Sequence, residues 1–422
     1  MMRKIFQKNI PFWSSIGASI EYYDFVAFAY LVPTLSIVFF EGSESAALLK
    51  TYMISSIAYF ARPLGSLVYG LVGDVRGRYK TFLSIMYTMT FSTLGIALIP
   101  SLTTIGILAP ILLFIFRFLQ GISFGAELPG AVILVSEHQR RETTGRSCGF
   151  IISSVTIGSI LASTVSFVMT FFYTEEEICT WAWRLPFLVG GLLGFLNLWV
   201  RKNLSETPVF LSRKEQEKFK SLWEPAKIIF KEHKIDLMLG TFLGFGVSCL
   251  IITYTYFPRL FPQFYGYDAK TIYWCLTLGL IWSAILTPCL GHLGDHWGKN
   301  RLFLGTSILG LFCMSPLFSF IQGGLKEMAL FCIGFQTLIA GFVISYFPIL
   351  ISLFQPKIRF TAITICYNIT YAIVSTFPIL FTSLLASPPV LLIKILIGCI
   401  VFSLMAFLGI MRRKQSFLLQ KH

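Results

Sequence analysis

Long apolar segments recur along almost the whole chain and are separated by short polar ones. A segment crosses a bilayer when it is about 20 residues long, because roughly 30 Å of hydrocarbon is crossed at about 1.5 Å per residue. Twelve segments meet this length, namely residues 12–40, 47–73, 81–100, 108–136, 147–172, 182–200, 235–261, 271–294, 302–322, 327–353, 360–386 and 389–411. The pattern predicts an all-α membrane protein with twelve transmembrane helices.

The composition agrees with this pattern and excludes other classes of protein. Of the 422 residues, 55% are hydrophobic and only 13% are charged, whereas soluble domains carry about 25% charged residues. The charges are too few to cover a water-facing surface, which excludes soluble multidomain proteins, disordered chains and coiled coils. The net charge of +14 would suit a nucleic-acid-binding protein only if the chain were soluble, so no nucleic-acid partner is expected.

The positive charges gather in alternate connecting segments. If the N-terminus is cytoplasmic, 26 of the 34 Lys and Arg residues fall in cytoplasmic segments and 6 fall outside or at span ends. The remaining two, Arg62 and Arg117, lie within predicted spans. Because cytoplasmic loops of membrane proteins are enriched in Lys and Arg, this distribution predicts that both termini are cytoplasmic.

Two cytoplasmic loops carry the same short motif. Residues 70–78 read GLVGDVRGR and residues 291–299 read GHLGDHWGK, with a spacing of 221 residues. The recurring positions are Gly70, Asp74, Gly77, Arg78, Gly291, Asp295, Gly298 and Lys299. The repeat predicts two six-helix bundles, residues 1–200 and 235–422, joined by a cytoplasmic linker loop at 201–234. Parallel halves around a central site are typical of transporters.

The motif is suited to a gate. Its glycines allow a tight turn and close helix approach, and its carboxylate can sit at a helix N-terminus or pair with an arginine across the bundle interface. We expect these contacts to hold the cytoplasmic side closed in one state and to release in the other.

Five ionisable residues within the spans are functional candidates, because each costs at least ~2.5–3.5 kcal/mol at membrane depth. They are Glu21, Asp24, Arg62, Arg117 and Glu127. Arginine stays charged, so one of the three acids has no fixed cation, and burial favours its neutral form. We expect Asp24 and Glu127 to exchange protons and Arg117 to modulate one of them. A purely structural ion-pair network is the alternative, and Glu21 suits neutralisation of Arg62 equally well.

Polar and aromatic residues of both halves are candidate substrate contacts: Glu21, Tyr23, Arg62, Gln336, Tyr367, Asn368 and Tyr371. Two arginines suit a carboxylate, whereas acids and aromatic rings suit a zwitterion or a betaine. The same residues also suit helix–helix hydrogen bonding and packing, so this alternative stays open. His292 and His296 flank Asp295 without further ligands nearby, and no metal site is expected.

Further motifs resemble those of one transporter family. They are EYYDF at 21–25, RPLG at 62–65, RFLQG at 117–121, GAE at 125–127, WRLPF at 183–187, ETP at 206–208, and Arg359 with YN at 367–368. Together they resemble the major facilitator superfamily and, within it, the metabolite:proton symporter family, which includes proline/betaine, α-ketoglutarate, citrate and shikimate transporters. Three features depart from that pattern: Ala18 for an asparagine, Ala126 for a glycine, and Ser375–Thr376 for a glycine pair.

This resemblance implies a secondary active transporter of the bacterial cytoplasmic (inner) membrane, without a cofactor, and not an enzyme. The expected activity is proton-coupled symport of a small polar metabolite, a proline/betaine-type zwitterion or a small carboxylate, by alternating access. A dicarboxylate or tricarboxylate carrier and a non-transporting sensor derived from a carrier are the alternatives. The expected partners are the substrate, protons and membrane lipid, and the expected state is a monomer. An ATP-driven pump is disfavoured because no GxxxxGK phosphate loop is present.

Overall fold

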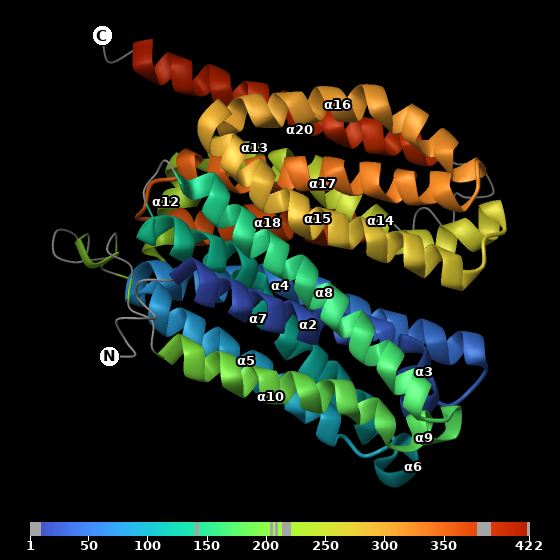
Figure 1. The fold of residues 1–422 in the computed structure, drawn as a ribbon. Helices are drawn as coiled ribbons and strands as arrows, with labels where there is room; N and C mark the ends of the chain where they lie inside the picture. The colour runs from blue at the N-terminus through green and yellow to red at the C-terminus, as the bar shows by residue number, and fades with distance from the viewer. Residues whose placement is uncertain are drawn as a thin grey trace. The chain divides into compact units, whose positions relative to one another are not determined.

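The computed structural model describes residues 10–139, 143–202, 206, 210–212, 221–377 and 390–419. These residues are almost entirely helical, and no strand occurs among them (Figure 1). The predicted all-α class is confirmed. The N-terminal charges Arg3, Lys4 and Lys8, much of the predicted linker, and residues 378–386 of the eleventh predicted span lie outside the described residues.

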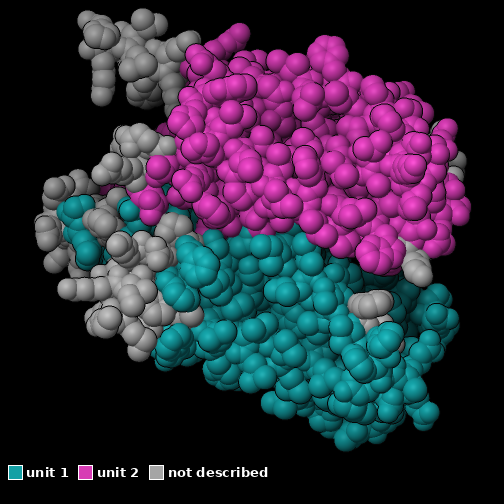
Figure 2. Space-filling view, viewed as in Figure 1, with its two compact units in different colours: residues 1–138, 154–222 teal, residues 139–153, 223–422 magenta. Residues whose placement is uncertain are grey.

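The chain divides into two compact units (Figure 2). Unit 1 consists of Met1–His138 and Ser154–Leu222, and unit 2 consists of Gln139–Ser153 and Trp223–His422. Helix α8 (Thr144–Phe172) therefore begins in unit 2 and continues into unit 1. The domain boundaries that the repeat predicts, at residues 200 and 235, stay a prediction.

Each unit is a bundle of long helices joined by short connections. The helices that begin in unit 1 are α2 (Ile10–Tyr30), α3 (Val32–Phe39), α4 (Glu44–Arg76), α5 (Arg78–Leu98), α6 (Leu102–Ile105), α7 (Leu108–His138), α9 (Glu175–Thr180), η2 (Ala182–Arg184) and α10 (Leu185–Lys202). Those of unit 2, apart from the start of α8, are α12 (Glu224–Glu232), α13 (Lys234–Leu243), α14 (Phe245–Tyr265), α15 (Ala269–Trp297), α16 (Lys299–Ser319), η3 (Phe320–Gln322), α17 (Leu325–Leu353), α18 (Arg359–Val374) and α20 (Val390–Leu419).

The same packing scheme occurs in both units. In unit 1, α7 packs against α4 and α5, and α10 packs against α5 and α2. In unit 2, α17 packs against α15 and α16, and α20 packs against α16 and α14. The helices that follow each loop motif, α5 and α16, thus have equivalent neighbours, which is the arrangement expected from an internal repeat.

Nine helices among the described residues are long and apolar enough to cross a membrane, and a bent pair makes a tenth. That pair is α2 and α3, whose axes meet at 62°. Pro33 is the second residue of α3, and proline is favoured in the first turn of a helix. The two remaining predicted spans correspond to α4, which carries several charged residues, and α18, whose expected continuation lies outside the described residues. Large exposed apolar side chains, such as those of Phe171 and Phe312, are suited to contact with lipid.

Candidate transport and proton-coupling site

Close backbone packing fixes the two helices that carry the buried arginines. A Cβ atom added at Gly65, Gly121 or Gly125 would collide with backbone atoms of the facing helix, so α4 and α7 approach each other as closely as only glycine allows. Arg62 on α4 and Arg117 on α7 are 3% and 1% exposed. The two guanidinium groups are therefore held at defined positions inside unit 1.

Asp24 on α2 lies buried between α5 and α10, with only 2% of its surface exposed. The hydroxyl of Thr93 on α5 donates a hydrogen bond of 3.3 Å to its Oδ2 atom. Its Oδ1 atom has no hydrogen-bond partner among the described residues and lies against Gly190 of α10, where any side chain would collide with it. Asp24 forms no ion pair with a described residue, which is the environment that a proton-accepting carboxylate requires.

Arg117 reaches Asp24 indirectly. Its Nη1 atom donates 2.9 Å to Oε1 of Gln120, and Nε2 of Gln120 donates 2.9 Å to Oγ1 of Thr93. Since Thr93 donates in turn to Asp24, a continuous chain of three hydrogen bonds joins the guanidinium to the carboxylate. Arg117 pairs with no carboxylate among the described residues. Its predicted influence on an acid stays a prediction, for which this chain of hydrogen bonds provides a route.

Glu21 and Tyr23 link α2 to α10. Asn197 donates a hydrogen bond of 3.0 Å to Oε1 of Glu21, and the hydroxyl of Tyr23 donates 2.9 Å to the carbonyl of Pro186. Both side chains are buried. Their predicted role in substrate binding stays a prediction, and in this conformation they connect two helices of unit 1.

Glu127 on α7 is the second candidate proton carrier, and its carboxylate has no hydrogen-bond partner in the described part of the chain. It is 2% exposed, and neither of its carboxylate oxygens has a hydrogen-bond partner among the described residues. No ion pair joins it to either buried arginine or to another residue of the described part of the chain. An ionised carboxylate in such surroundings is costly, so the site suits a group that is neutral when it is buried.

Aromatic rings surround the buried cations. The guanidinium carbon of Arg62 lies 4.3–4.4 Å from the ring centroids of Phe25, Tyr59 and Phe124. That of Arg117 lies 4.5 Å from the ring of Phe25. Phe25 is thus in contact with both cations, and cation–π attraction offsets part of the cost of burying two positive charges.

The predicted contacts of unit 2 lie on α17 and α18 and are all neutral. Gln336 is 4% exposed and forms no hydrogen bond with a described residue. Asn368 donates 2.9 Å to the carbonyl of Thr364, one turn earlier on the same helix, and the rings of Tyr367 and Tyr371 pack with centroids 4.6 Å apart. A substrate role for these residues remains a prediction.

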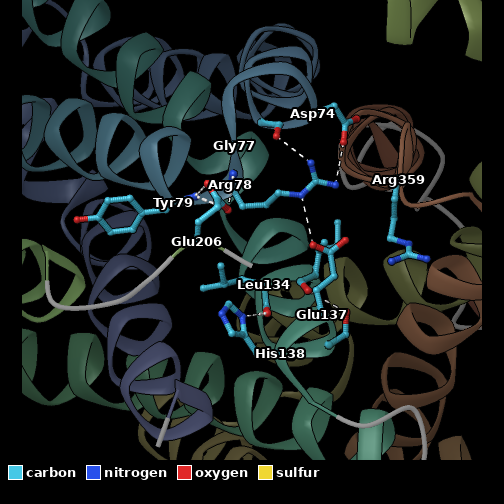
Figure 3. Close-up of polar contacts among 12 residues, drawn as sticks. Asp74, Gly77, Arg78, Tyr79, Leu134, Glu137, His138, Glu206 and Arg359 are labelled. Carbon is cyan, nitrogen blue, oxygen red and sulfur yellow. Dashed lines mark hydrogen bonds and ion pairs between the residues drawn. The ribbon is translucent and has the colours of Figure 1, made fainter. Parts of the chain in front are cut away.

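In the first copy of the loop motif, the aspartate pairs with an arginine (Figure 3). The Arg78 guanidinium lies 3.0 Å from Asp74 and 3.4 Å from Glu137 on α7, and all three side chains are buried. Gly77 has φ +113°, and the Glu206 carboxylate accepts hydrogen bonds from the first two backbone N–H groups of α5. The network holds the adjacent ends of α4, α5 and α7 together.

In the second copy, the aspartate caps a helix. Asp295 accepts hydrogen bonds of 2.6 and 2.8 Å from the backbone N–H groups of residues 145–146, at the N-terminus of α8, where a negative charge is favourable. Lys299, which matches Arg78, donates 2.9 Å to the carbonyl of Pro348. Gly298 has φ +91°, as the equivalent turn requires. The second copy therefore shows the helix-terminal role expected from the sequence. In the first copy the aspartate pairs with the arginine of its own motif, four residues later, and the predicted pairing across the bundle interface stays a prediction.

Sequence reasoning missed several residues of this arrangement. Thr93, Asn197 and Gly190 belong to none of the motifs, and no sequence signal marks them. Gln120 and Glu206 lie within quoted motifs, and a buried amide three residues after a buried arginine is a signal for Gln120. No group of three potential metal ligands occurs among the described residues.

Comparisons with known proteins agree with the fold. The family model described as Major Facilitator Superfamily matches residues 14–377. A Staphylococcus aureus protein with a provisional proline/betaine transporter name is 32% identical over 375 residues, covering 85% of this chain and 78% of that protein. The Escherichia coli proline/betaine transporter is 30% identical over 395 residues, covering 89% and 77%. The structure of the proton:xylose symporter XylE bound to 6-bromo-6-deoxy-D-glucose matches with TM-score 0.78 and 16% identity, covering 97% and 96%.

Proposed function

The chain belongs to the major facilitator superfamily, and we propose that it is a proton-coupled symporter of a small zwitterionic metabolite of the proline/betaine type. The observation that carries the proposal is Asp24, a buried carboxylate without a counter-ion among the described residues. The names of its relatives support the substrate class. A small carboxylate is the alternative substrate.

In the proposed mechanism, Asp24 takes up a proton on the side of higher proton concentration and releases it on the other side. The proton is accepted on Oδ1, because Oδ2 already accepts the Thr93 hydrogen bond. Protonation removes a buried negative charge, which lowers the cost of enclosing the site during a conformational change. Glu127 is proposed as a second group that is neutral while it is buried.

We propose that residues of both halves contact the substrate during alternating access. Arg62 and Glu21 would recognise opposite charges of a zwitterion, while Gln336, Tyr367, Asn368 and Tyr371 would supply neutral hydrogen bonds and aromatic surface. The two loop motifs would act as the cytoplasmic latch. We further propose that the protein acts as a monomer in the bacterial inner membrane with both termini in the cytoplasm.

The test is uptake of labelled proline by purified protein in liposomes with an inward proton gradient. We expect labelled proline to accumulate. A protonophore should abolish this accumulation, and unlabelled glycine betaine should reduce it by competition. Competition by citrate or α-ketoglutarate but not by betaine would select the carboxylate carrier. Accumulation that survives the protonophore contradicts proton coupling, and an absence of transport for every compound favours the sensor.

A further inference from the structure

The hydrogen-bond chain between Arg117 and Asp24 has only one possible direction. A guanidinium group carries donors and no acceptor, so the oxygen of the Gln120 amide has to face Arg117 and its NH₂ group has to point away. That NH₂ group donates to the hydroxyl oxygen of Thr93. The Thr93 hydroxyl hydrogen is then donated to Asp24. In all three hydrogen bonds, the donor lies on the Arg117 side and the acceptor on the Asp24 side.

We propose that Gln120 and Thr93 are positioning residues that set the pH range over which Asp24 exchanges its proton. The inference rests on the proposed role of Asp24 as the proton carrier. Arg117 polarises the Gln120 amide, and the amide fixes the rotation of the Thr93 hydroxyl, so that a donor always faces Oδ2. A fixed donor stabilises the charged form of the carboxylate and keeps proton release possible in a buried site.

Among the described residues, no other side chain on the facing helices supplies this donor. Within the described residues, α5 and α10 face Asp24 with Thr93 and Gly190, and only the Thr93 hydroxyl donates to the carboxylate. Other buried ionisable side chains on α2, α4 and α7 include Glu21, Tyr23, Arg62, Arg117 and Glu127. The hydroxyl of Tyr23 is directed to Pro186. Removal of the Thr93 hydroxyl therefore leaves the charged carboxylate without its donor.

The experiment is an infrared titration of the protonated carboxyl band of Asp24 in the full-length protein in lipid nanodiscs. The band is identified by its loss in Asp24→Asn, so the measurement needs no substrate. Thr93→Val keeps the shape and removes the donor, and we expect its titration midpoint to rise by about one pH unit or more. Gln120→Leu removes the NH₂ donor without adding a charge and lets the Thr93 hydroxyl turn away, so it should raise the midpoint as well.

Two variants control for packing. Thr93→Ser retains the donor and should titrate like the wild type. Thr90→Val removes a buried hydroxyl one turn away on α5 that has no bond to Asp24, and it should leave the midpoint unchanged. A wild-type midpoint in both Thr93→Val and Gln120→Leu overturns the positioning role while leaving Asp24 as the carrier. A wild-type protein without any titrating Asp24 band overturns the proposed proton carrier itself, and the positioning role with it.

Discussion

The interiors of the two units differ in the kind of polar group that they bury. Among the described residues, the buried charged side chains all belong to unit 1: Glu21, Asp24, Arg62, Asp74, Arg78, Arg117, Glu127 and Glu137. Unit 2 buries only neutral polar side chains in its described part, among them Gln336, Asn368 and a series of serines and threonines. The two units repeat the same helix packing, but among the described residues only unit 1 buries charged side chains.

The difference between the two interiors favours different roles for the two units. Buried charges are expensive at membrane depth and are retained where they act, and a neutral interior cannot exchange protons near neutral pH. We infer that unit 1 carries the proton chemistry and that unit 2 contributes neutral contacts.

The largest effect is expected from Asp24→Asn. The amide cannot accept a proton as a carboxylate does, so the ratio of internal to external proline under a proton gradient should fall to about one. Exchange of labelled for unlabelled proline does not need net proton movement and should continue. Glu41→Gln, an exposed change outside the interior, should accumulate proline like the wild type. Gradient-driven accumulation of proline in Asp24→Asn would contradict the inference that unit 1 carries the proton chemistry.

The two motif aspartates should differ in their effect on stability. Asp74→Asn leaves the Arg78 guanidinium buried with one anion fewer, and breaking a buried pair costs about 3–5 kcal/mol. Asp295→Asn weakens a helix cap, which costs about 0.5–2 kcal/mol. Thermal unfolding followed by size-exclusion chromatography should therefore rank wild type above Asp295→Asn and Asp295→Asn above Asp74→Asn. The reverse order would show that the ion-pair network does not stabilise unit 1.

Two glycines test the tight packing around Asp24. Gly190→Ala places a methyl group against the Asp24 carboxylate, and overpacking costs typically about 1–3 kcal/mol. Gly398 on α20 has no atom within 4 Å of an added Cβ, so Gly398→Ala should leave the melting temperature unchanged or slightly higher. Equal melting temperatures for both variants would indicate that the Asp24 site is looser than the structure describes.

The smallest effect is expected from Gln336→Leu in unit 2. Loss of one neutral hydrogen bond to substrate should raise KM for proline about 3–10-fold without moving the pH dependence of transport. Thr337→Val, in which the altered hydroxyl instead bonds Trp282 and its own helix, serves as the control. An unchanged KM removes Gln336 from the substrate site, and a shifted pH profile contradicts the neutral role of unit 2.

Most of the fold follows from the sequence. Apolar segments of sufficient length predict the spans, and the repeated loop motif predicts the repeated bundle. The break between α2 and α3 is harder to predict from the sequence, because Pro33 is compatible either with a kinked helix or with the start of a new one. The division of α8 between the two units is not predicted either, because it depends on which neighbours the first turns of the helix contact.

The site is predicted only in part. Asp24 and Arg117 stand out because a charged residue in an apolar segment is conspicuous. Thr93 and Gly190 are ordinary residues of apolar helices, and their role depends on the rotation of α5 and α10 relative to α2. That rotation is a property of side-chain packing over the whole bundle, so a local pattern does not reveal the chain from Arg117 to Asp24.

The most direct test of proton chemistry in unit 1 is proton entry that accompanies substrate entry. Purified protein is placed in liposomes with a trapped pH-sensitive dye and no initial gradient, and proline is added outside. We predict that the lumen acidifies with the wild-type protein and stays at constant pH with Asp24→Asn. In separate liposomes preloaded with unlabelled proline, both proteins should exchange it for labelled proline. Proline entry without acidification in the wild type, or equal acidification with Asp24→Asn, would contradict the account.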